Sequence, residues 1–388
     1  MIQRGIATFT LDYGKCPPWL FERMVKLGRE MAQVIVAAEG PDEFIRRLAD
    51  PAWFQALGTV LAFDWNASGL TTILTAALKE AIRGQEHDLG VYICGGKGKT
   101  SRKTPDEIFK WSEKLNLAPS AANSLVYNSK MAAKVDSSLL QDNFQIYHHS
   151  FFFTRNGAWT VIQQGMNTAS QTARRYHWHS RDVKDLVCEP HSAITSDIKL
   201  QNALNLTAQN SEKTRQTSSE LITQGFNAVM KDFVLLSKYY TPLSQMIEVK
   251  SGPRQLKLLN LEPREFHYHP AVKEDFSKNR YLKKILWEIC DRRPENYEKL
   301  LATPGVGPKT MRALALVAEV IYGAKPSYED PARYSFAHGG KDATPFPVNT
   351  KTYDITIETL KEYANRTRLP LPEKQKILKR LNDSRESF

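Results

Sequence analysis

Residues 300–310 read Leu300-Leu-Ala-Thr-Pro-Gly-Val-Gly-Pro-Lys-Thr310, and they join two segments that both favour helix. A polar run that starts at Asn296 precedes the stretch, and an apolar helical run, Met311–Tyr322, follows it. Pro304-Gly-Val-Gly307 between them predicts a tight turn. Glycines let a backbone approach a phosphate closely, and the amides that open a helix direct donors at an anion. The stretch therefore predicts binding to a nucleic-acid backbone without base reading. The alternative is a plain helical hairpin with a glycine turn.

This pattern, over residues 296–322, is a helix-hairpin-helix, and it resembles the hairpin of DNA glycosylases, whose lysine forms a Schiff base. The matching residues are Gly305, Val306, Gly307, Lys309 and Thr310. In that family an essential Asp follows in a V-D-x-H segment. Here Asp330 lacks the pattern, and Asn349 stands where the Asp is needed. The resemblance therefore implies DNA binding at the hairpin and leaves Lys309 as the runner-up nucleophile.

The charge balance points to a polyanionic partner. The 388 residues include 53 Lys and Arg against 42 Asp and Glu, a formal net charge of +11. The four cysteines form no C-x-x-C pair, which disfavours a zinc ribbon or an iron–sulfur loop. The chain shows no leader, and no apolar run reaches about 18 residues, so we expect no membrane contact. We expect a cytoplasmic, nucleoid-associated protein without a cofactor.

The pattern along the chain predicts an α+β fold in three parts. Residues 1–195 alternate helical and strand-like segments, and predicted helices begin at Pro18, Pro41 and Pro51. Asn156-Gly157 between two β-rich runs predicts a β-hairpin. Residues 196–252 are polar and helical, which predicts a connector. Residues 253–388 form a helical domain that carries the hairpin at 296–322. The sequence leaves the oligomeric state and the role of the connector open.

A glycine-rich basic loop is the first candidate site. Gly95–Pro105 follows a predicted strand and precedes a predicted helix, a context that suits a phosphate cradle. It is not a P-loop, because Ile93 stands where the first glycine is needed. Clustered cations lower each other's pKa, and a neutral amine attacks an aldehyde. We expect DNA contacts from Gly95, Gly96, Gly98 and Arg102, and a nucleophile among Lys97, Lys99 and Lys103. The alternative is a flexible basic loop.

Two further constellations follow. Lys134 is a fourth candidate nucleophile, and Asp136 or His148 could remove a carbon-bound proton. The alternative for this group is a half-exposed loop with a surface ion pair. The run from Arg174 and Arg175 to Arg181 mixes cations with aromatic residues, which suits a nucleic-acid strand, although a half-buried strand fits equally. Two His-x-His pairs lack a third ligand, so we expect no metal site.

Blocks spread along the chain resemble a single family. They are Arg4–Ala7, Gly14–Leu20, Trp53–Gly58, Phe63–Thr72, Gly95–Pro105, Gln141–Phe153, Gln163–Asn167 and Arg174–Trp178. They are similar to the thermophile-centred family long catalogued as domain of unknown function number 763. The resemblance implies abasic-site (AP) lyase activity on DNA, in base excision repair, and a fold unlike the standard repair enzymes.

The expected reaction is Schiff-base formation followed by β-elimination, with or without glycosylase activity. A lysine would attack C1′ of an abasic sugar, and loss of the C2′ proton would release the 3′ phosphate. Two other classes stay open. One is a DNA- or RNA-binding accessory protein without catalysis. The other is a metal-dependent nuclease, for which the sequence offers only scattered carboxylates.

Overall fold

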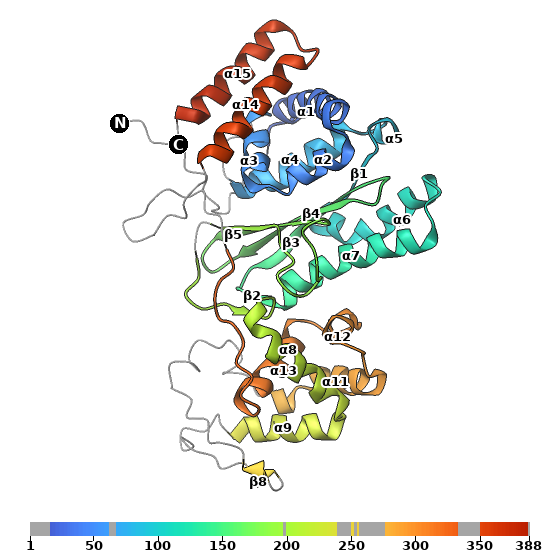
Figure 1. The fold of residues 1–388 in the computed structure, drawn as a ribbon, viewed down its shortest axis with the longest axis vertical. Coiled ribbons are helices and arrows are strands. Elements are labelled where there is room, and N and C mark those ends of the chain that lie inside the picture. Colours follow the sequence, from blue (N-terminus) through green and yellow to red (C-terminus); the bar gives the residue numbers. More distant parts are fainter. Residues whose placement is uncertain are drawn as a thin grey trace.

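The computed structural model describes residues 16–61, 67–196, 199–238, 250–251, 254–255, 276–332 and 350–386. Its centre is a five-stranded antiparallel sheet with helices on both faces (Figure 1). In spatial order the strands are β1 (Val91–Lys97), β3 (Gln145–Thr154), β4 (Trp159–Asn167), β5 (Thr172–His179) and β6 (Ala193–Ser196). This mixture of helices with an antiparallel sheet confirms the predicted α+β class.

The predicted β-hairpin is confirmed as β3–β4. Its turn contains Asn156 and Gly157, and Gly157 adopts φ +86°, a conformation that glycine tolerates without strain. The Thr154 amide donates to the Ala158 carbonyl at 3.0 Å and closes the turn. The strands on either side pair in antiparallel register.

Alternation along the strands sends side chains into two separate cores. Phe152 packs with Val91 and Ile93 on one face, whereas Phe151 and Phe153 pack on the other. All three phenylalanines are fully buried. The sheet is therefore the middle layer of a three-layer structure, and its polar side chains also face helices.

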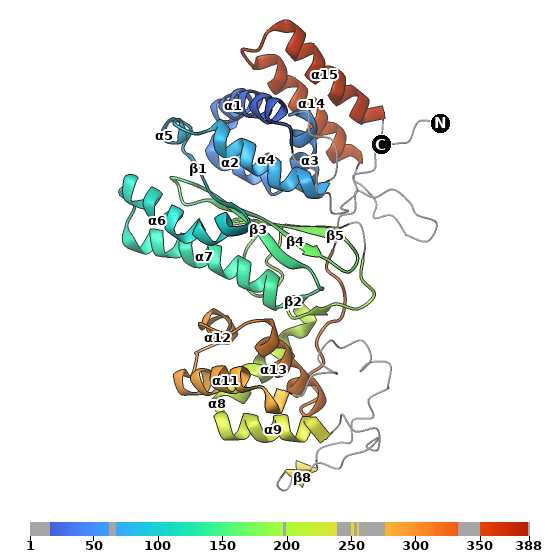
Figure 2. The same cartoon turned by 180° about the vertical axis from the view of Figure 1, so that it is seen from behind.

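One face of the sheet carries the N-terminal helices. They are α1 (Pro18–Glu39), α2 (Pro41–Leu48), α3 (Pro51–Val60), α4 (Ala67–Ala81) and α5 (Glu86–Leu89). Pro18, Pro41 and Pro51 occupy first helical positions, where the missing N–H is not needed. The last two helices of the chain, α14 (Thr350–Arg366) and α15 (Leu371–Glu386), pack into this same core (Figure 2).

The other face carries α6 (Thr104–Lys114) and α7 (Pro119–Ser138), and a helical lobe continues beyond them (Figure 1). The lobe contains α8 (Glu212–Thr223), α9 (Phe226–Lys238), α11 (Arg280–Arg292), α12 (Tyr297–Ala302) and α13 (Pro308–Val320). Short strands β2 (Leu140–Gln141) and β7 (Leu204–Asn205) pair between α7 and the lobe, and β8 (Lys250–Ser251) pairs with β9 (Arg254–Gln255).

The packing corrects the predicted domain boundaries at two places. Helices α8 and α9, expected in a connector over 196–252, share a core with α11–α13. Helices α14 and α15, expected in the domain 253–388, belong to the N-terminal helical layer. Both differences arise from apolar contacts between segments that are distant in the sequence.

Within the described ranges, no helix has both the length and the apolar composition needed to cross a membrane. Some expectations lie outside these ranges. They concern Asn349, the boundary at Gly252-Pro253 and the His267–His269 pair.

Candidate functional site

The segment expected as a loop after the strand begins inside it, because Gly95, Gly96 and Lys97 are the last residues of β1 and pair with β3. Gly95 adopts φ +84°, and a Cβ there would lie 2.2 Å from the His149 carbonyl oxygen, so only glycine fits. Its amide donates to Glu107 Oε2 at 2.8 Å, and its carbonyl accepts from Lys79 Nζ at 3.0 Å. The amide expected to contact a phosphate is therefore already bound by a carboxylate at the start of α6.

Beyond Gly95 the loop becomes a cationic surface. Gly96 ends the tightly packed part, and a 3-10 turn, Gly98–Lys103, leads into α6. The exposed cations of this segment are Lys97, Lys99, Arg102 and Lys103. None of the four forms an ion pair with another residue in the described part of the chain. Exposed cations without carboxylate partners are suited to a polyanion.

Lys97 lies beside a cluster of buried side chains. Its Nζ is 5.9 Å from the ring centre of Tyr147, whose hydroxyl accepts a hydrogen bond from Gln164. Lys97 pairs with His148 in the β1–β3 register, so the two side chains share a face of the sheet. The Lys97 amine thus lies close to the Tyr147 ring and on the same face of the sheet as the His148 imidazole.

His148 is inside the protein, only 1% exposed. Its Nε2 lies 3.1 Å from both Thr75 Oγ1 and Ser150 Oγ. Burial, reinforced by His149 and by Lys97, lowers the pKa of His148 to about 3. The ring is therefore neutral at pH 7. It does not reach the surface, contrary to what a base acting directly on DNA would require.

Lys134 and Asp136 point away from each other, because residues two apart on a helix occupy different faces. Lys134 Nζ donates to the carbonyl oxygens of Leu301 and Thr303 at 2.6 and 2.8 Å. It thereby caps the end of α12 and ties that helix to α7. Burial lowers the pKa of Lys134. The expected pair of Lys134 with Asp136 does not form, and the lysine has a structural role at the hairpin.

Asp136 faces the sheet and is fully buried. Its Oδ2 accepts from Gln163 Nε2 at 2.5 Å and from Trp178 Nε1 at 3.1 Å, and its Oδ1 lies 2.5 Å from His191 Nε2. Burial raises the pKa of Asp136, whereas the His191 and Trp178 contacts lower it. Sequence reasoning missed His191, which lies in an irregular loop and has no motif around it.

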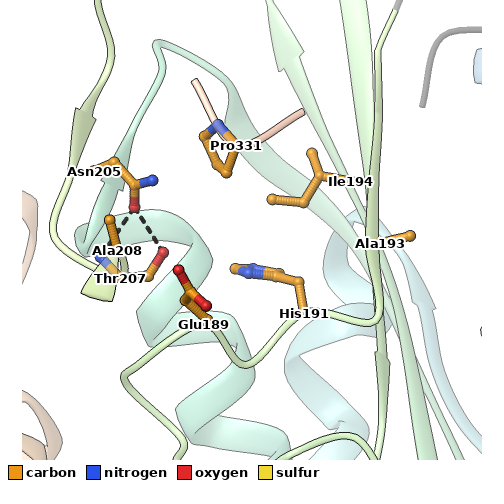
Figure 3. A pocket seen from close by; sticks show the side chains of 8 residues that line it. All are labelled: Glu189, His191, Ala193, Ile194, Asn205, Thr207, Ala208 and Pro331. Carbon is orange, nitrogen blue, oxygen red and sulfur yellow. Dashed lines mark hydrogen bonds between the residues drawn. The ribbon is translucent and has the colours of Figure 1, made fainter. Parts of the chain in front are cut away.

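His191 opens onto a pocket of about 110 Å³ (Figure 3). The polar side chains of its wall are Glu189, Asn205 and Thr207, and Ile194 and Pro331 supply apolar surface. On the inner side of Asp136, Gln163 Oε1 lies 2.9 Å from His149 Nδ1, and His149 Nε2 lies 2.9 Å from Ser129 Oγ. A continuous chain of hydrogen bonds therefore runs from the interior to the pocket.

Arg174 and Arg175 are buried, which corrects the expectation that they contact DNA. Arg174 binds Asp330 with two hydrogen bonds, at 2.9 and 2.7 Å, and Asp142 with one at 2.9 Å. Arg175 donates to His177 Nε2 at 2.9 Å and lies 4.6 Å from the ring centre of Phe54. Strand alternation sends one arginine into each core, where each is surrounded by protein.

The turn between α12 and α13 has two different glycines. Gly305 adopts φ +82°, and a Cβ there would lie 2.3 Å from Ile285 Cδ1 on α11. Gly307 is extended, and a Cβ there would meet no atom within 4 Å. Gly305 is thus required by packing, whereas Gly307 leaves open space in front of the first turn of α13. Lys309 is partly exposed, whereas Thr310 is buried. The side chain of Thr310 is therefore not accessible for the DNA contact that the sequence predicted.

Among the residues that the structure describes, no three His, Cys, Asp or Glu side chains come together as a metal site would require.

Comparison with known proteins gives one family. A family model described as "Protein of unknown function (DUF763)" matches residues 5–348, which include the sheet, the basic loop and the α12–α13 turn. No curated protein matches the chain, and no solved structure matches it either. The family model spans well over half of the chain. The chain therefore belongs to the DUF763 family of proteins of unknown function.

Proposed function

We propose that this protein is a DNA AP lyase and that Lys97 is its nucleophile. The observation that carries the proposal is the surroundings of the Lys97 amine. It is exposed, it has no carboxylate partner within the described ranges, and it ends β1 directly before a turn that carries three further cations. Lys134, the alternative nucleophile, has its amine bound by two carbonyl oxygens.

The reaction needs no cofactor. The neutral amine attacks C1′ of the ring-opened abasic sugar, and loss of water gives an imine. The imine acidifies the C2′ proton. Removal of that proton sends its electron pair into a C2′–C3′ double bond and expels the 3′ phosphate. Water then hydrolyses the imine and frees the lysine.

Neither Asp136 nor His148 is exposed, so neither removes the C2′ proton directly. The loop carries other amines, Lys99 and Lys103, and one of these in its neutral form can accept the proton. Arg102 stays charged and suits the leaving phosphate.

The α12–α13 turn is the second contact with DNA in this proposal. Open space at Gly307 lets a phosphate approach the amides that begin α13. Such contacts fix the position of the duplex and make binding sensitive to salt. An enzyme of this kind acts at the nucleoid.

Borohydride trapping tests the proposal. The protein is incubated with a duplex that contains one abasic site, in the presence of EDTA, and reduced. We expect a covalent adduct whose trapped peptide contains Lys97. Lys97→Ala should abolish the adduct, whereas Lys130→Ala, an exposed lysine on α7, should leave it unchanged. Adduct formation at full level by Lys97→Ala would transfer the role to Lys99, Lys103 or Lys309, which mass mapping distinguishes.

A second candidate function is DNA or RNA binding without catalysis, which the open turn at Gly307 and the net charge already favour. Salt-sensitive binding without adduct or strand cleavage would select it. Strand cleavage that EDTA abolishes would instead select a metal-dependent nuclease.

A further inference from the structure

The pocket at His191 is separate from the basic loop, and the proposed lyase reaction does not use it. It is enclosed by the loop before β6, the segment after β7, and Pro331 from the C-terminal lobe (Figure 3). The pocket volume is about 110 Å³. One water molecule needs about 10–15 Å³ on this scale, so the pocket can hold several waters or one small chemical group.

The dyad of Asp136 and His191 fixes the state of the imidazole. Nε2 of His191 lies 2.5 Å from Asp136 Oδ1, and with the ring proton on Nε2 the imidazole donates to that carboxylate. The two ring nitrogens diverge, and Nδ1 has no hydrogen-bond partner anywhere in the described structure. The free side of the His191 ring therefore offers Nδ1 to the pocket as a hydrogen-bond acceptor.

The rest of the polar wall also consists of acceptors. The Thr207 hydroxyl donates to Asn205 Oδ1 at 2.7 Å, so its lone pairs remain for a ligand. The Asn205 amide donates to the Glu329 carbonyl at 3.2 Å. Glu189 adds a carboxylate, one oxygen of which receives the Gln209 amide at 3.4 Å. A lining with one carboxylate, one imidazole and one hydroxyl oxygen suits a ligand group that donates N–H hydrogen bonds.

Glu189 itself is held in an unfavourable backbone conformation. Its φ is +45°, in the left-handed region that non-glycine residues seldom adopt. A hydrogen bond from its amide to the Thr207 carbonyl, at 2.8 Å, holds it there. Strain of this kind gathers at binding sites, where it fixes a side chain in a position that function requires. The side chain of Glu189 is exposed, and it supplies the only carboxylate among the residues that line the pocket.

We propose that this pocket binds the amino group of a small molecule, with Glu189 as the carboxylate partner and His191, oriented by Asp136, as a hydrogen-bond acceptor. The amino group can belong to a free aliphatic amine or to the edge of a nucleobase. Both present N–H donors to the same three acceptors, and the test below separates them.

The test uses the full-length protein and imidazole NMR signals, with His191 assigned by its loss in His191→Gln. Methylammonium and cytidine are titrated separately, with uridine as the control that lacks the amino group. We expect a saturable shift of the His191 signals with at least one of the two amines and none with uridine. Methylammonium alone would identify a free amine as the ligand type, and cytidine alone would identify an amino-bearing base. No saturable shift with either would overturn the proposal.

Glu189 supplies the second readout. Glu189→Gln removes the charge at constant size and should weaken amine binding about tenfold, as expected for a lost charge-assisted hydrogen bond. Glu189→Gly should abolish binding and raise the melting temperature, because glycine relieves the positive φ. Glu295→Gln, at an exposed site outside the pocket, is the matched control and should bind as the wild type does. Equal binding by wild type and Glu189→Gln would refute the assigned role.

Discussion

Replacing Arg174 by Met should destabilise the protein strongly, because in the described part of the chain Arg174 is the cation that pairs with two buried carboxylates. Asp142 and Asp330 both bind its guanidinium, and all three side chains are fully shielded from solvent. Removing one member of a buried ionic group leaves uncompensated charge and typically costs about 3–5 kcal/mol. A domain is stable by about 5–15 kcal/mol in total, so this one change should remove a large part of the free energy of unfolding.

The pH dependence of this loss can be worked out from the same contacts. Burial raises the pKa of Asp142, and Arg174 lowers it. Without the arginine, the folded-state pKa of Asp142 rises further above its unfolded value. Acid then protonates the carboxyl preferentially in the folded state and relieves the unpaired charge. The destabilisation should therefore be largest above pH 7 and smaller near pH 5.

Urea unfolding followed by circular dichroism, at pH 7.5 and 5.5, measures both quantities. Arg102→Met, at an exposed position of the basic loop, is the matched control and should change stability by less than about 0.5 kcal/mol. Restoring neutrality with Asp142→Asn and Asp330→Asn in the Arg174→Met background should recover part of the loss. A change for Arg174→Met as small as that of the control would refute the interior role of this arginine.

Three further results are expected from the same fold. Lys134→Met should lower the free energy of unfolding by about 2 kcal/mol, through two lost charge-assisted hydrogen bonds, and leave borohydride trapping intact; loss of trapping in a folded variant would restore its catalytic candidacy. Gly305→Ala should destabilise the lobe, since its Cβ would lie 2.3 Å from a side chain of α11. Gly307→Val should fold normally and bind DNA of any sequence less tightly. An unchanged DNA affinity of Gly307→Val would mean that the turn has only a structural role. The pKa values of His148 and His149 in the folded protein, about 3 and about 4, lie below the value in the unfolded chain. The free energy of unfolding should therefore fall as the pH drops below about 6.5, by up to about 1.4 kcal/mol per pH unit for each ring. His148→Gln and His149→Gln should each flatten this pH dependence, and an unchanged slope would contradict the burial of neutral imidazoles.

The elements that the sequence predicted are those with local signals. Asn156-Gly157 favours a tight hairpin turn, because glycine readily adopts a positive φ. Pro18, Pro41 and Pro51 mark helix starts, because the proline ring fixes φ near its helical value. Gly307 directly precedes α13, as the sequence predicts, whereas Gly95, expected in a loop after the strand, lies within β1. Such features depend on a few neighbouring residues, so they can be recognised before the chain is folded.

The roles that the sequence did not predict depend on distant partners. Lys134 and Leu301 are 167 positions apart, and nothing near either residue indicates that one caps the helix of the other. In the sequence, Arg174 and Arg175 resemble part of a basic surface. In the structure, strand alternation directs their side chains to opposite faces of the sheet, and both are buried. His191 lies in a loop without periodicity, and it acquires a role only because Asp136 on α7 lies beneath it.

The return of α14 and α15 to the first helices of the chain has a consequence for biosynthesis. The side chains of Ile357, Leu360 and Leu381 complete the core that α1–α4 begin, although the family match ends at residue 348. At about 5–20 residues per second, the ribosome needs about 15–60 s to make the roughly 300 residues between the end of α4 and the end of α15. Throughout that time the apolar side chains that α14 and α15 cover in the finished fold lack this cover. We expect the nascent chain to depend on chaperones until translation is almost complete.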